Sequence, residues 1–330
     1  MTMLARDFGV ELEGACGNVN ACPSGWETAY DSSVRGIEAD QEECVHCDIH
    51  GDVWNVVSRR YRRCQNCNGR HYITHGQSLH PVELVSPRLR DLGAIDSAYE
   101  YISQYGWGIN ESHGLHVHVD CTGVRAKAIR RIVMLSAMVE PLFYGMNDES
   151  RWEGSYAKPM SYMHKNVINE GQHIDHGELS EAIYGSYYEL RRVNKYMEER
   201  YYGLNLHSYF LRETIEFRYF MGSPNAEYAK QRVELCVKMV DFAINASEEQ
   251  LLTVITHLDQ ASTFDSRWAV LREVLDLGYT IDAYQDSTGE AHFQRALRHL
   301  RDEGILSTIH NLIPFYNEHP SERRVAERLA

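Results

Sequence analysis

Four short segments of this sequence alternate chemically reactive side chains with apolar ones. They are residues 8–13, 82–87, 115–120 and 214–220. A period of two predicts β-strands with one buried face, because successive side chains of a strand point to opposite faces. The polar positions hold Glu, His and Arg instead of the Lys, Thr and Ser that are usual on a solvated sheet. We therefore expect one sheet whose polar face carries a functional site.

Apolar residues also recur at helical spacing after Ala128 and again after Asn225. Leu135, Met138 and Leu142 share one helical face, and residues 233, 237, 240 and 244 share another. Such helices need an apolar surface to cover. The sequence thus predicts an α+β fold in which helices pack on one face of a mostly antiparallel sheet, leaving the carboxylate-bearing face as a cleft.

Composition narrows the class of protein. The chain has 330 residues, and its 33 Lys and Arg against 47 Asp and Glu give a formal net charge of −14. The most apolar stretch, residues 132–144, is interrupted by Ser136, Glu140 and Pro141 and is too short to span a bilayer. The N-terminus is charged where a secretory signal would be apolar. We expect a cytoplasmic protein that makes no contact with a membrane.

Cys44, Cys47, Cys64 and Cys67 form two C-x2-C pairs separated by sixteen residues. This spacing is typical of four thiolates that bind one structural Zn²⁺ in a zinc ribbon. We therefore predict a zinc-ribbon insertion over residues 39–78. It divides a discontinuous catalytic domain, residues 1–38 and 79–246, and a helical C-terminal extension follows over residues 247–330.

A basic run, Ser-Arg-Arg-Tyr-Arg-Arg at residues 58–63, lies between the two cysteine pairs. Four arginines and a tyrosine are able to meet phosphates. However, residues 41–76 contain five Arg against four Asp and Glu, which gives a weak electrostatic attraction for nucleic acid. Nucleic acid is therefore a partner that the sequence does not favour.

Four glutamates, one from each of two strands and two from a third, are expected to converge in the cleft. Carboxylates this close repel one another unless cations neutralise them, and such oxygen-rich sites suit Mg²⁺ or Mn²⁺. An arginine two residues beyond a ligand carboxylate offers a planar fork of donors to phosphate. The pattern predicts a site for the phosphates of a nucleotide. The glutamates and the arginine are Glu11, Glu13, Glu83, Glu216 and Arg218.

Taken in order, the motifs of this chain resemble the putative amidoligase family, whose members are carboxylate-amine ligases related to glutamine synthetase and glutamate-cysteine ligase. The match covers residues 6 to about 245. It is carried by Phe-Gly-Val-Glu-Leu-Glu at 8–13, Asp-Ser-Ser at 31–33, Glu-Leu-Val-Ser-Pro at 83–87, Gly-Leu-His-Val-His-Val-Asp at 114–120, Arg-Tyr at 200–201, Leu-Asn-Leu at 204–206 and Thr-Ile-Glu-Phe-Arg at 214–218. The resemblance implies a curved antiparallel sheet of the glutamine-synthetase type and ATP-dependent amide formation.

The resemblance also implies roles for individual residues. Arg218 would hold phosphate, and Glu216, His118 and Asp120 join it as candidate catalytic residues, although the spacing does not select the group that takes the amine proton. Ser32 stands where the family more often has Gly. The implied metal ligands are Glu11, Glu13, Glu83, His116 and Glu216, the implied nucleotide contacts are Arg200, Asn205 and Arg218, and the implied substrate contacts are Asp31, Ser33 and Tyr201.

The implied reaction has two steps. A substrate carboxylate attacks the γ-phosphoryl group of ATP, and an amine then displaces phosphate from the acyl phosphate. Either substrate is compatible with a peptide or a protein. Three alternatives stay open: a phosphagen-type kinase in the same cleft, a metal hydrolase built on His116 and His118, and a non-catalytic zinc-ribbon binding protein with an inactive cleft.

Overall fold

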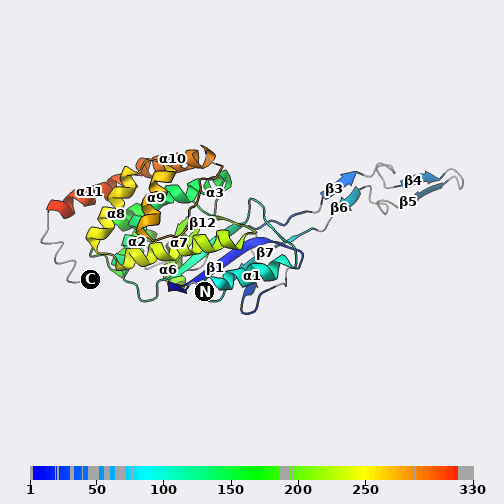
Figure 1. Cartoon of the computed structure of the whole chain (residues 1–330), viewed down its shortest axis with the longest axis horizontal. Coiled ribbons are helices and arrows are strands. Elements are labelled where there is room, and N and C mark those ends of the chain that lie inside the picture. The colour runs from blue at the N-terminus through cyan, green and yellow to red at the C-terminus, as the bar shows by residue number, and fades with distance from the viewer. Residues whose placement is uncertain are drawn as a thin grey trace.

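The computed structural model describes residues 3–318, except 19, 21, 30–32, 39, 44–51, 56–59, 64–71, 76–77, 186–193, 195 and 286. One open antiparallel sheet runs through the body of the molecule (Figure 1). Its strands are β1 (Met3–Cys16), β2 (Glu27–Ala29), β7 (His80–Val85), β8 (Leu89–Asp91), β9 (Trp107–Gly108), β10 (Gly114–Asp120), β11 (Leu204–Asn205) and β12 (Thr214–Met221).

The order across this sheet is β11-β12-β10-β1-β7-β2, and β8 and β9 also pair with β1. The four segments with a period of two fall in the strands β1, β7, β10 and β12, except that residues 86–87 follow the end of β7. The predicted mixture of helices with an antiparallel sheet is therefore confirmed. The long first strand is central, because it pairs with both β10 and β7.

Helices cover the apolar face of the sheet. The helix α7 packs on β1 and β10, and α2 packs in turn on α7. The helical elements are α1 (Gly93–Ser103), α2 (Ala126–Gly145), α3 (Glu149–Glu153), α4 (Tyr162–Asn169), α5 (His176–Tyr184), η2 (Glu198–Tyr201, a 3-10 turn), α6 (His207–Arg212), α7 (Ala226–Asn245), α8 (Glu248–Gln260), α9 (Phe264–Val274), α10 (Ser287–Asp302) and α11 (Ile305–Glu318).

The helix α2 is buried on every side, although the sequence predicts a single apolar stripe. Even Arg130, Arg131 and Glu140 are buried in it. The reason is that α8, α9, α10 and α11 pack against α2. Between residues 248 and 318 the chain forms the helices α8 to α11, and they complete the core around this helix. None of the described helices combines the length and apolar character that a membrane crossing requires.

A slender arm leaves the body between β2 and β7 (Figure 1). Two antiparallel strand pairs form it, β3 (Asp40–Glu43) with β6 (Tyr72–His75) and β4 (Asp52–Asn55) with β5 (Arg60–Arg63). At its base, Ile37 and Leu79 exchange backbone hydrogen bonds of 2.8 and 2.7 Å. The four cysteines predicted to bind zinc lie outside the described residues, so the zinc ribbon stays a prediction.

Candidate functional site

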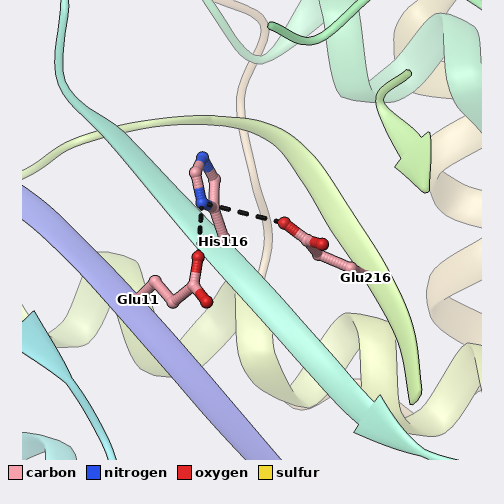
Figure 2. Close-up of side chains that lie close together, drawn as sticks. All are labelled: Glu11, His116 and Glu216. Atoms are coloured by element: carbon pink, nitrogen blue, oxygen red, sulfur yellow. Dashed lines mark hydrogen bonds and ion pairs between the residues drawn. The ribbon is translucent and has the colours of Figure 1, made fainter. Parts of the chain in front are cut away.

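Three buried side chains from neighbouring strands meet at the centre of the polar face (Figure 2). They are Glu11 of β1, His116 of β10 and Glu216 of β12, and their ligand atoms all lie within 4.8 Å of one another. The Nδ1 atom of His116 lies 3.0 Å from Oε2 of Glu11 and 3.8 Å from Oε1 of Glu216. We call these three residues the central triad.

Strand register explains why residues so far apart in sequence meet here. Glu11 is the register partner of His116, and Glu216 is the partner of His118. Between the pairs Leu115–Phe220 and Val117–Phe217, β12 has two residues where β10 has one. This is a β-bulge, a feature that re-aims side chains. It falls at Arg218, beside the triad.

Opposite charges surround the carboxylates of the triad. The Nε2 atom of His118 lies 3.2 Å from Oε1 of Glu11, and NH1 of Arg218 lies 2.6 Å from Oε1 of Glu216. Burial alone would raise the pKa of Glu11, but His118 and His116 hold it well below its usual value. Burial likewise opposes the ionised form of Glu216, and Arg218 and His118 keep its pKa lowered. Both glutamates are therefore carboxylates ready to bind a cation.

The same electrostatics act on the cations. Burial lowers the pKa of His118, but Glu216 and Glu11 beside it raise that pKa above its ordinary value. The pKa of the Arg218 guanidinium is also raised, because Glu216, Glu11 and Glu13 outweigh its burial. Imidazole and guanidinium groups thus offset a buried negative charge that a divalent ion would offset more fully.

Glu13 and Glu83, the two other predicted metal ligands, flank the triad. Oε1 of Glu13 lies 3.5 Å from Nε2 of His116, and its Oε2 accepts a hydrogen bond of 2.5 Å from the backbone N–H of Gly114. Glu83 is the register partner of Glu13 on β7 and is half-buried. Among the described residues, the set close enough to share one ion comprises the triad alone.

Arg218 and Asn205 both hold Glu216 in place. The amide of Asn205 donates a 2.5 Å hydrogen bond to Oε2 of Glu216. Nε of Arg218 donates to the backbone carbonyl of Tyr156 at 2.9 Å, so the guanidinium is fixed at two points. In this structure Asn205 orients a triad carboxylate, and its contact with a nucleotide stays a prediction.

A cavity of about 340 Å³ opens beside the triad, where β1, β10 and β12 meet the turn after β7. His118 and Asp120 line it, as the shared face of β10 predicts. Oδ1 of Asp120 accepts a hydrogen bond from Thr122 at 2.7 Å and pairs with Arg88 at 2.8 Å. The volume suits a small molecule or one end of a larger one.

The remaining predicted contacts are Arg200 and Tyr201, which lie near Arg218, Ser33, which lies elsewhere, and Asp31. Arg200 lies over the ring of Tyr201, with 5.4 Å from its guanidinium carbon to the ring centroid. The rings of Tyr201 and Tyr156 meet edge to face at 5.3 Å, so this aromatic pair adjoins Arg218 through Tyr156. Ser33 is half-buried in the loop that leads to the arm, and Asp31 lies outside the described residues.

Sequence patterns missed two arginines of the site. Arg212, the last residue of α6, has its NH1 3.0 Å from Oε1 of Glu11. Arg151 of α3 is buried and donates to the backbone carbonyl of His113, next to Gly114. Burial lowers the pKa of Arg151, and Glu13 opposes that shift. Both arginines lie in helices of five or six residues, too short to show a period.

The ligand chemistry of the triad fits a metal ion. Two carboxylates and one imidazole, all buried and within 4.8 Å, are donors that suit Mn²⁺ and, through their oxygens, Mg²⁺. A pair of imidazoles, as in many zinc hydrolases, would add His118, whose Nε2 atom lies 3.2 Å from Oε1 of Glu11 and 3.8 Å from Oε1 of Glu216.

The chain was compared with known proteins and with models of protein families. A search of curated proteins gives no match. The model of one protein family, described as putative amidoligase enzyme, matches residues 4–240, which include every residue of the triad and both strands of the histidine and arginine motifs. The chain therefore belongs to the putative amidoligase enzyme family.

Proposed function

We propose that this protein is an ATP-dependent carboxylate-amine ligase that works through an acyl-phosphate intermediate. The observation that supports it most directly is the pairing of a buried metal-type triad with Arg218, which lies 2.6 Å from Glu216. Metal ligands beside a fixed guanidinium are the combination that phosphoryl transfer needs. Membership of the amidoligase family supports amide formation as the second step.

In this proposal Glu11, His116 and Glu216 hold Mg²⁺ or Mn²⁺, with Glu13 and Glu83 beside them. The ion, when bound, neutralises charge on the phosphates of ATP. Arg218 binds the γ-phosphate, and its contacts with Tyr156 and Glu216 keep the guanidinium plane in position. Arg200 and Tyr201 adjoin Arg218 through Tyr156 and are placed to meet the remainder of the nucleotide.

The two steps balance as follows. An oxygen of the substrate carboxylate attacks the γ-phosphorus, the bond to the β-phosphate oxygen breaks, and ADP leaves. The amine then attacks the acyl carbon, phosphate leaves, and the proton of the amine passes to a carboxylate. Asp120 is suited to that last task because it lines the cavity beside His118. Burial of the triad shields the acyl phosphate from water.

We further propose that the arm carries a structural Zn²⁺ on Cys44, Cys47, Cys64 and Cys67. Four thiolates complete a closed tetrahedral site and leave no position for a substrate. The zinc would then stabilise the arm, and the arm would dock a large carboxylate or amine substrate such as a peptide or protein.

Activity with a trapping amine tests the proposal. Protein with Mg²⁺, ATP, hydroxylamine and a panel of carboxylic acids should form ADP, phosphate and a hydroxamate in equal amounts. Glu216→Gln should lower turnover about a hundred-fold or more while the circular dichroism spectrum stays unchanged. Glu100→Gln, an exposed residue of α1, is the matched control and should keep full activity.

Two results would reject the ligase. One is a failure to bind ATP with any divalent ion, and the other is full activity of Glu216→Gln toward an identified substrate. Formation of ADP with a phosphorylated amine or guanidine, and no amide, would instead identify the protein as the phosphagen-type kinase.

A further inference from the structure

Arg212 connects the surface of the protein to the buried triad. It ends α6, and 59% of its side chain is exposed, whereas only 11% of the Glu11 side chain is. Despite this difference, NH1 of Arg212 lies 3.0 Å from Oε1 of Glu11. A long and largely exposed side chain therefore supplies one of the cations that neutralise a buried carboxylate.

A divalent ion and Arg212 would compete for the same group. Glu11 belongs to the triad, and its Oε1 already faces Nε2 of His118 at 3.2 Å. A divalent ion bound at the triad would stand within a few ångströms of the guanidinium, and like charges repel strongly at the edge of a protein interior. The half-exposed arginine is the cation that is free to leave, because Arg218 is buried and held at two points.

The cavity is where a displaced Arg212 would go. Arg212 already lines it, together with Val85, Pro87, His118 and Thr214. The apolar walls suit a short carbon chain, and a guanidinium that lines the cavity offers a fork of donors that matches a carboxylate. A carboxylate bound there would lie beside the triad, where its phosphorylation is proposed to occur.

We propose that Arg212 is a resident counter-ion of Glu11 that a divalent ion displaces, and that the released guanidinium then binds the carboxylate group of the substrate in the adjoining cavity. Metal binding thereby frees NH1 of Arg212, the atom that pairs with Glu11, so that the whole guanidinium fork is available to the substrate. This inference rests on the proposed function, because it assumes that the triad binds a divalent ion.

The first test measures metal affinity without any reaction. Titration with Mn²⁺, followed by the electron paramagnetic resonance signal of the free ion, should show that Arg212→Ala binds Mn²⁺ about five-fold more tightly than wild type, since a competing ion pair is gone. Arg88→Ala is the matched control. Arg88 is equally exposed, at 60%, and lines the same cavity, but it pairs with Asp7 and Asp120 instead of the triad. Its affinity for Mn²⁺ should change less than two-fold.

The second test measures how tightly the cavity binds a carboxylate with and without a divalent ion. Butyrate, a carboxylate with a short apolar tail, is the probe, and saturation-transfer NMR reports its binding. Wild-type protein should bind butyrate at least about five-fold more tightly with Mg²⁺ than without it, and Arg212→Ala should lose this gain. A metal-bound crystal structure should place NH1 of Arg212 more than about 4 Å from Oε1 of Glu11, beyond the limit of an ion pair.

These results separate the inference from the proposed function. If wild type binds Mn²⁺ and Glu216→Gln does not, but Arg212→Ala matches wild type in both tests, the counter-ion role is wrong and the ligase proposal stands. If wild type binds no divalent ion, both fall. The inference is also wrong if the affinity for butyrate is the same with and without Mg²⁺. It is equally wrong if Arg212 still pairs with Glu11 in the metal-bound crystal structure.

Discussion

Gly114 allows the backbone of β10 to lie against a carboxylate of the site. Its N–H donates to Glu13, and a Cβ atom at this position would lie 3.0 Å from Oε2 of Glu13 and from NH1 of Arg151. Both atoms end flexible side chains, so Gly114→Ala should fold and melt within a few degrees of wild type. The Glu13 carboxylate must shift by a few tenths of an ångström, however, and we expect ligase turnover to fall about ten-fold or more.

The matched control for this change is Gly278→Ala. A Cβ at Gly278 meets no atom within 4 Å, and no strained backbone is present there. Its activity and melting temperature should equal those of wild type. Wild-type turnover in Gly114→Ala would show that the position of Glu13 does not matter to the reaction.

Glu140 makes the stability of the fold depend on pH. Burial raises its pKa to about 8, despite hydrogen bonds from the Tyr219 hydroxyl at 2.8 Å and the Met160 N–H at 3.0 Å. Between the unfolded pKa near 4.5 and about 8, the folded state holds a proton that the unfolded state has lost. The contribution of Glu140 to stability is therefore fully present below the unfolded pKa and is lost as pH rises to about 8.

Chemical denaturation at several pH values measures this effect. From pH 5 to pH 8, one proton held only by the folded state lowers the free energy of unfolding by at most roughly 1.4 kcal/mol per pH unit. Glu140→Gln should remove this downward slope. Glu100→Gln, which changes an exposed glutamate, should retain the wild-type slope. Equal slopes in wild type and Glu140→Gln would mean that Glu140 is ionised in the folded protein.

At the scale of elements, the arm and the sheet should hold different metals. Thiolates retain Zn²⁺, whereas the triad prefers hard ions that exchange readily. Metal analysis after dialysis against a mild chelator should therefore find about one zinc per chain. Replacing Cys44 and Cys47 together by Ser should lose that zinc and make residues 39–78 sensitive to protease, since so short an insertion has little core of its own.

ATP binding provides the control for the arm. The triad lies on β1, β10 and β12, which the arm does not contain, so the cysteine variant should bind ATP with Mg²⁺ as wild type does. Turnover of a large substrate should fall if the arm docks it. A zinc that survives the double replacement, or that leaves only when Glu11 or His116 is changed, would place the ion in the sheet and favour the hydrolase.

At the scale of the whole molecule, the C-terminal helices complete the core although the family match ends at residue 240. Helices α8 to α11 pack against α2. Phe264, Phe293 and Leu300 are among the buried side chains that they contribute, and Arg267 donates to the Met138 carbonyl at 3.1 Å. Each buried side chain of this size contributes about 1.5–3 kcal/mol.

A chain of residues 1–246 should therefore fail to fold. The lost burial exceeds the net stability of a typical protein, about 5–15 kcal/mol, even though every residue of the triad is present. We expect aggregation on size-exclusion chromatography and no cooperative melting. The control deletes the arm between Ile37 and Leu79, whose hydrogen-bonded pairing closes the gap, and should melt cooperatively. If the chain of residues 1–246 is monomeric and unfolds cooperatively, the fold does not require the packing of α8 to α11 against α2.

The sequence alone determined which residues share a face. Alternation in a strand is a local property of the backbone, so Glu11, His116 and Glu216 could be assigned to the polar face before any pairing was known. Helical periods likewise located α2 and α7, because 3.6-residue repeats need no knowledge of neighbours. Cysteine spacing predicted a zinc site in the same way, although those cysteines lie outside the described residues.

Only the tertiary structure decided how the site closes. Glu11 and His116 are 105 residues apart, and their 3.0 Å contact depends on the register between β1 and β10. The bulge at Arg218, the reach of Arg212 to Glu11 and the burial of all sides of α2 depend on contacts that no local pattern records. A period reveals the direction of a side chain, whereas the distance between two side chains is set by strand pairing and packing across the whole chain.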